Sequence, residues 1–71
     1  MSPFFELLAE VIKNHCFEPL DDETLRRVNY EMLTLAPGPY RIALSNTKIF
    51  EVQFLIEENS EELFLWKLRW L

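Results

Sequence analysis

The sequence predicts an α+β fold in which two N-terminal helices pack on one face of a three-stranded antiparallel β-meander, in the order α-α-β-β-β. Two observations predict it: apolar residues recur every three to four positions up to about residue 36, and at every second position from about residue 40. The 71 residues are 49% apolar and contain one glycine. This composition favours a dense core in a single compact domain that covers residues 1–71.

The helices are expected at about residues 3–17 and 22–35. Ser2 and Asp21 are suitable N-cap residues, and Pro3 falls at the first helical position, where its missing N–H costs nothing. In the first helix the apolar face includes Cys16 as a small core residue, with His15 at the margin of the core. The Pro-Gly-Pro run at residues 37–39 ends the second helix.

Strands are expected at about residues 40–45, 49–57 and 62–71, because β-branched and aromatic residues alternate there with other side chains. A three-residue loop at 59–61 would place Phe54 opposite Trp66 on the inner face. The same register would place Glu51 opposite Arg69 on the outer face, so that acid meets base. Both tryptophans would then lie in the core, beneath the helices.

The outer sheet face and the C-terminal edge strand are the predicted contact surface, because an outer face meant only for water is usually more polar. A surface without function is the alternative: scattered exposed leucines are ordinary, and cationic side chains blunt an edge strand. The candidate interface consists of residues from the second and third expected strands: Ile49, Glu51, Leu55, Leu63, Leu65, Lys67, Arg69 and Leu71.

No catalytic, cofactor-binding or metal-binding site is expected. His15 and Cys16 are adjacent in the chain, so in a helix their side chains point about 100° apart and do not face each other. The chain has one histidine and one cysteine, whereas a structural metal site needs about four ligands. The sequence therefore predicts a protein that is not an enzyme and needs no cofactor.

The net charge of −5, from 12 acidic and 7 basic residues, makes nucleic-acid binding an unfavourable expectation. Glu6 and Glu10 interrupt the apolar residues of the first helix, so we expect neither a signal peptide nor a membrane span. A lone cysteine forms no internal disulfide, which favours a cytoplasmic location. The expected partner is a protein or a second copy of the chain.

We therefore expect a small intracellular adaptor or regulatory protein that acts through protein–protein contacts. The alternative is an acidic inhibitor or nucleic-acid mimic that uses the acidic runs at residues 18–23 and 57–62. A winged-helix-like nucleic-acid binder is disfavoured, since its recognition helix would begin with the three acids at residues 21–23. An enzyme would need His15 or Cys16 exposed in a pocket.

Overall fold

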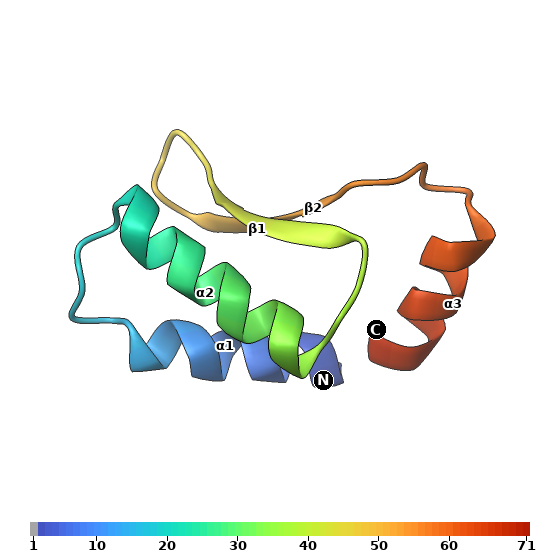
Figure 1. Ribbon diagram of the computed structural model, residues 1–71, viewed down its shortest axis with the longest axis horizontal. Coiled ribbons are helices and arrows are strands. Elements are labelled where there is room, and N and C mark those ends of the chain that lie inside the picture. Colours follow the sequence, from blue (N-terminus) through green and yellow to red (C-terminus); the bar gives the residue numbers. More distant parts are fainter. Residues whose placement is uncertain (1) are drawn as a thin grey trace.

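A computed structural model describes residues 2–71 and shows three helices and one β-hairpin (Figure 1). Helices α1 and α2 form a layer on one face of the two-stranded antiparallel sheet, and α3 lies beyond the end of the sheet. Within this part of the chain, no helix has the length and hydropathy needed to cross a bilayer. The α+β class is confirmed, but the order is α-α-β-β-α: α1 (Pro3–Asn14), α2 (Asp22–Leu35), β1 (Tyr40–Leu44), β2 (Phe50–Phe54) and α3 (Glu61–Trp70).

The first two helices begin at the predicted caps. Ser2 Oγ accepts a hydrogen bond from the Phe5 N–H at 3.2 Å, and Asp21 Oδ1 accepts one from the Thr24 N–H at 2.9 Å. The hydrogen bond from the Thr24 backbone also lowers the pKa of Asp21. These side chains satisfy backbone donors that have no partner within the helix.

Helix α1 ends at Asn14, three residues before the predicted position. The His15 N–H bonds to the Ile12 carbonyl at 3.0 Å, which tightens the last turn and ends the helical path. Cys16 follows in a turn and is exposed, so the prediction that it is a core residue is wrong.

The hairpin confirms the first two predicted strands, although both are shorter than expected. Its register pairs Tyr40 with Phe54, Ile42 with Val52 and Leu44 with Phe50. On the other side of β1, the Asn29 side chain of α2 accepts from the N–H of Ile42 and donates to its carbonyl, both at 2.8 Å. These two hydrogen bonds attach α2 to the edge of β1.

The predicted third strand at residues 62–71 is wrong, because Glu61–Trp70 forms helix α3. Ser60 caps this helix, its Oγ accepting from the Leu63 N–H at 3.3 Å. Acidic residues occupy the first turn and basic residues the last turn, which matches the helix dipole. The buried residues Leu63 and Trp66 are three positions apart, as on one face of a helix.

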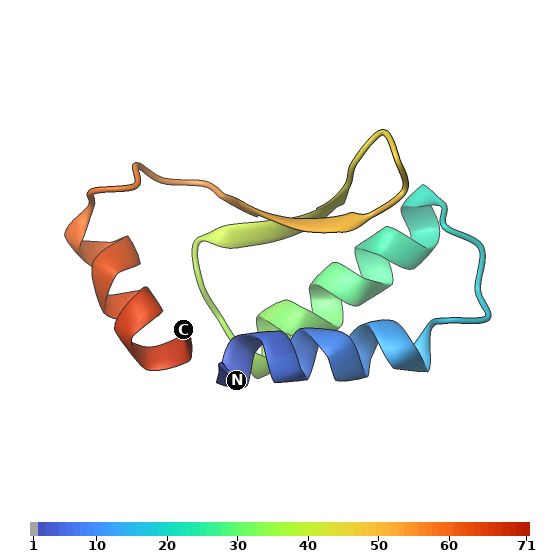
Figure 2. The ribbon, with the colours of Figure 1, turned by 180° about the vertical axis from the view of Figure 1, so that it is seen from behind.

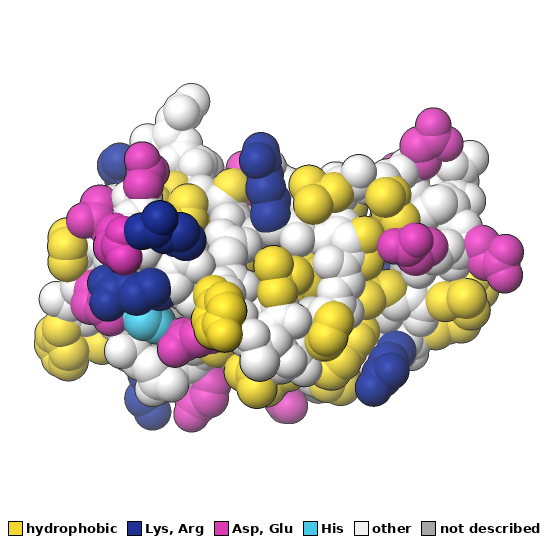
Figure 3. All heavy atoms as spheres, viewed as in Figure 1, with side chains coloured by type: hydrophobic (Ala, Val, Ile, Leu, Met, Phe, Trp, Pro, Cys, Tyr) yellow, Lys and Arg dark blue, Asp and Glu magenta, His cyan; other side chains and the backbone are white. Residues whose placement is uncertain are grey.

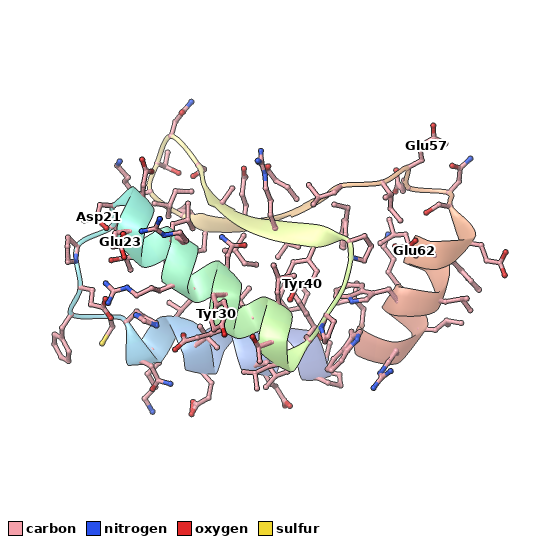
Figure 4. All side chains as sticks on the ribbon, in the orientation of Figure 1. Asp21, Glu23, Tyr30, Tyr40, Glu57 and Glu62 are labelled. Atoms are coloured by element: carbon pink, nitrogen blue, oxygen red, sulfur yellow. The ribbon has the colours of Figure 1, made fainter. Side chains whose placement is uncertain are left out.

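The core ends in an aromatic cluster that joins α1, β1 and α3. The ring centres of Phe4 and Tyr40 are 5.0 Å apart, as are those of Phe4 and Trp66. The Tyr40 hydroxyl points down from the sheet toward the helices (Figure 4) and donates to the Ala36 carbonyl at 2.7 Å. Burial raises the pKa of Tyr40 to about 12. Trp66 Nε1 donates to the Pro37 carbonyl at 3.0 Å, which attaches α3 to the segment between α2 and β1.

Candidate protein-interaction site

Helix α3 exposes a row of large apolar side chains on the side opposite its buried residues. The exposed fractions are 59% for Phe64, 55% for Leu65 and 68% for Leu68, and Leu71 continues the row at the end of the helix. The 3.6-residue period groups these four residues on one side. We call these four residues the α3 outer face.

Charges of opposite sign lie at the two ends of the α3 outer face. Glu61 and Glu62 are in the first turn, while Lys67 and Arg69 are in the last turn. Lys67 Nζ lies 5.3 Å from the centre of the Phe54 ring, and the Arg69 guanidinium lies 5.3 Å from a Trp70 ring centre. These contacts hold the cations against aromatic rings. The apolar face is therefore bordered by acids at one end and by bases at the other.

The predicted interface residues fall into two groups and one buried position. Leu63 is fully buried and anchors α3 to the core, so it is not available to a partner. The first group lies on or directly after α3 and consists of Leu65, Lys67, Arg69 and Leu71. The second group lies on or beside β2 and consists of Ile49, Glu51 and Leu55.

Sequence reasoning placed Phe64 and Leu68 on the inner face of a strand, whereas the structure exposes both. The signal that identifies them was present in the sequence. Ser60 followed by two acids, with Lys67 and Arg69 about two turns later, is the charge pattern of a capped helix.

The outer face of the sheet is polar at its centre, where the sequence also placed Glu51. Arg41 Nε donates to Gln53 Oε1 at 2.8 Å, and Gln53 Nε2 donates to Glu51 Oε1 at 2.9 Å. This chain of hydrogen bonds suits contact with water. Exposed apolar side chains lie on α3 and at the two ends of β2, and others lie on α1, on α2 and between these two helices.

The protein exposes more surface than its size requires. Its accessible area is 5201 Å², whereas a monomer of 8.5 kDa is expected to expose about 4,650 Å². The excess of about 550 Å² accompanies an elongated shape, with extents of 37 × 22 × 19 Å. Figure 3 shows apolar side chains gathered in several places over the front of the molecule and around α3.

A second cluster links the end of α1 to α2 through His15. Its Nε2 lies 2.7 Å from a Glu31 oxygen, and its Nδ1 bonds to Glu18, which also pairs with Arg27. The Glu31 hydrogen bond is the main reason that the pKa of His15 is raised; Glu18 adds to this effect, and burial opposes it. Both ring nitrogens face carboxylates, so this arrangement favours the protonated form of the His15 ring. Among residues 2–71, no group of three metal-ligating side chains gathers around it.

An open groove of about 690 Å³ runs between α2 and the hairpin. Three cations line it, but Arg26 already pairs with Glu23, and Arg41 bonds to Gln53. The remaining cation, Lys48, lies at the hairpin turn with a positive φ of 62°. Arg26 is the lining cation that has an ion pair, and Asp22 adds a negative charge, so the lining of the groove carries charges of both signs.

Comparison of the chain with protein-family models, with curated proteins and with solved structures found no match.

Proposed function

We propose that the protein is a small non-enzymatic adaptor or regulator that binds another protein through the α3 outer face. The observation that carries the proposal is the exposed row of Phe64, Leu65 and Leu68 on a helix whose other side is anchored in the core. Groups of large apolar residues on the surface of a soluble domain are typical of interaction sites. The lone cysteine is consistent with action inside the cell.

The charges around the face indicate what kind of partner fits. An apolar groove or helix would cover Phe64, Leu65 and Leu68, and this burial would supply most of the binding energy. Basic groups would suit the Glu61 end of the helix, and acidic groups the Arg69 end. Such complementarity fixes the orientation of a partner more than it adds affinity. The partner is therefore expected to carry an apolar strip with charges arranged in the opposite order.

The test is affinity purification from the native host with a tag at the N-terminus, followed by quantitative mass spectrometry. The variant Leu65→Ser/Leu68→Ser removes the centre of the face, and Phe17→Ser is the matched control, because Phe17 is fully exposed in the turn after α1. A stoichiometric partner that is lost with the double variant and kept with the control would support the proposal. No partner, or a partner kept by both variants, would contradict it.

A second candidate is an acidic inhibitor that imitates the phosphates of a nucleic acid. Glu57, Glu58, Glu61 and Glu62 are all exposed and lie close together in the chain at the start of α3. Figures 3 and 4 show acidic side chains projecting at this end of the molecule, with Glu57 and Glu62 labelled. Reversal of all four charges to lysine would abolish binding to a basic partner, whereas the double leucine variant would leave that binding unchanged.

A further inference from the structure

We propose that β2 pairs with β2 of a second copy of this chain, in antiparallel orientation, with Val52 on the two-fold axis. The product is a four-stranded sheet in the order β1-β2-β2-β1. This inference concerns a different surface from the α3 outer face and does not depend on it.

The first step is that β2 has a free edge, whereas the centre of the other edge, on β1, is occupied by Asn29. On the outer side of β1, Asn29 occupies both the N–H and the carbonyl of Ile42. Across residues 2–71, β2 pairs with β1 alone. In the view from behind, no helix lies across its other edge (Figure 2). An uncovered edge strand is a template for another strand.

The second step concerns which residues of β2 present their backbone groups to that edge. The hairpin bonds from Ser45 N–H to Ile49 O and from Leu55 N–H to Pro39 O involve odd-numbered residues. Bonded and non-bonded pairs alternate along an antiparallel ladder. The even-numbered residues Phe50, Val52 and Phe54 therefore direct their N–H and carbonyl groups away from β1.

The third step is that the segment Ile49-Phe-Glu-Val-Gln-Phe-Leu55 is self-complementary. Pairing about Val52 places Phe50 opposite Phe54, so residues with free backbone groups oppose each other in the bonded register. Glu51 then faces the Gln53 amide of the second copy. Ile49, which is 64% exposed, faces Leu55, which is 60% exposed.

Neighbouring registers lose this match. If the register slips by one residue, the free backbone groups of one β2 lie opposite residues of the second β2 whose backbone groups already bond to their own β1. A slip of two in one direction puts Glu51 opposite Glu51 of the second copy, which is destabilising, and in the other direction it puts Glu51 opposite Leu55. Neither proline nor lysine, which protect natural sheet edges, occurs between residues 49 and 55.

The partly exposed apolar side chains of β2 are consistent with pairing to a second copy of the hairpin. Phe50 and Val52 are only half-buried against the helices, and Phe54 is exposed beside them. A second hairpin in the same sheet would extend the cover over these side chains on both copies.

The test is sedimentation equilibrium of the purified full chain over a wide concentration range, for wild type, two β2 variants and the variant Leu65→Ser/Leu68→Ser. Gln53→Glu places two carboxylates opposite each other at two symmetric positions and should raise the dimer dissociation constant about tenfold or more. The double variant Glu51→Gln/Gln53→Glu has the same net charge as wild type and exchanges the positions of the glutamate and the glutamine. It should restore wild-type association, because glutamate again faces glutamine.

Amide hydrogen exchange provides a second readout that does not depend on a variant. The N–H of Val52 should exchange more slowly as protein concentration rises, because the dimer ladder covers it. Far-UV circular dichroism checks that each variant is folded. A monomer at every concentration would overturn the proposal, as would a dimer that Gln53→Glu leaves intact. A dimer lost only with Leu65→Ser/Leu68→Ser would assign self-association to the α3 outer face instead.

Discussion

Substitution of Gly38 by alanine tests how α3 is attached to the rest of the protein. The Cβ of an alanine at this position would lie 2.1 Å from Trp66 Nε1 and 2.6 Å from Trp66 Cδ1. Both distances are far shorter than any van der Waals contact. The φ angle of Gly38 is not positive, so its backbone conformation is open to alanine and the effect is steric. The indole of Trp66 must therefore move.

The expected cost follows from what the indole loses when it moves. Inserting a methyl group into a packed site costs about 1–3 kcal/mol. Loss of the hydrogen bond from Trp66 Nε1 to the Pro37 carbonyl adds about 1 kcal/mol. The sum of about 2–4 kcal/mol is a large share of the total stability of a 71-residue domain, which is about 3.5–10 kcal/mol.

The assay is equilibrium unfolding in urea, followed by tryptophan fluorescence and by far-UV circular dichroism. Both tryptophans, Trp66 and Trp70, lie in α3, so fluorescence reports on this helix. With a slope near 1 kcal/mol per molar urea, the midpoint should fall by about 2 M or more. A fluorescence transition that precedes the dichroism transition would show that α3 detaches before the core unfolds.

A double-mutant cycle with Trp66→Leu separates the clash from other effects of Gly38→Ala. In the Trp66→Leu background the added methyl group no longer meets an indole, so it should cost less than about 0.5 kcal/mol. Equal losses in both backgrounds would refute the reasoning, because they would place the cost in the backbone. So would a single variant as stable as wild type.

Three further changes test other contacts of the fold. The raised pKa of His15 means that the folded state favours the protonated ring. The protonated ring stabilises the fold fully below about pH 6.5, the ordinary histidine value, and this stabilisation is lost as pH rises through the raised pKa. The melting temperature should therefore fall between about pH 5.5 and 8.5 in wild type, and His15→Gln should lack this fall. Asn29→Ala leaves the N–H and carbonyl of Ile42 without these partners and should lower the free energy of unfolding in urea by about 2 kcal/mol. Ser60→Ala removes the cap of α3 and should cost about 1 kcal/mol in the same assay.

Two of these changes have a matched control. Ser60→Asp keeps a capping oxygen and should retain most of the stability. Thr34→Ala removes a hydroxyl that bonds only to the Tyr30 carbonyl within α2, so it should change the urea midpoint far less than Asn29→Ala. The His15 reasoning is wrong if wild type and His15→Gln show the same slope of stability against pH.

The first two helices and the hairpin could be predicted because their signals are local. Ser2 and Asp21 are caps, the run at residues 37–39 is a stop, and the change of hydrophobic period marks the start of β1. The early end of α1 was not predictable in this way. It coincides with contacts of His15 to Glu31, sixteen residues away in the sequence, and such a contact leaves no local pattern.

Helix α3 was mistaken for a strand because almost every residue from 63 to 71 is apolar. A nearly continuous apolar run fits a period of two and a period of 3.6 equally well. Cross-strand pairs such as Phe54 with Trp66 added false support, since any register of such a run pairs apolar residues. The decisive evidence was at the ends, where the Ser60 cap and the charge order along the helix favour α3.

The expectation that part of the C-terminal apolar run faces outward does not depend on the strand prediction. A nearly continuous apolar run cannot be buried on all sides in a domain of this size, so some of it must face outward whether it is a strand or a helix. Leu65 and Leu71 are exposed in the structure for this reason. Which residues share the exposed side depends on the period, so the strand prediction placed Phe64 and Leu68 inward and Leu63 outward, whereas the structure exposes the first two and buries Leu63.

The two proposed surfaces have a joint consequence if both are correct. Each α3 follows the Phe54 end of its own β2, and antiparallel pairing about Val52 sends the two Phe54 ends in opposite directions. A dimer would therefore present two α3 outer faces at opposite ends of one sheet, and a partner with two binding sites would gain from avidity. Gln53→Glu should then weaken binding to a surface coated with the partner by about tenfold or more, while its affinity for a single partner site in solution stays unchanged. Surface plasmon resonance with the partner immobilised at high and at low density measures both quantities. Equal losses at the two densities would contradict this arrangement, because they would mean that the substitution acts on the partner contact itself.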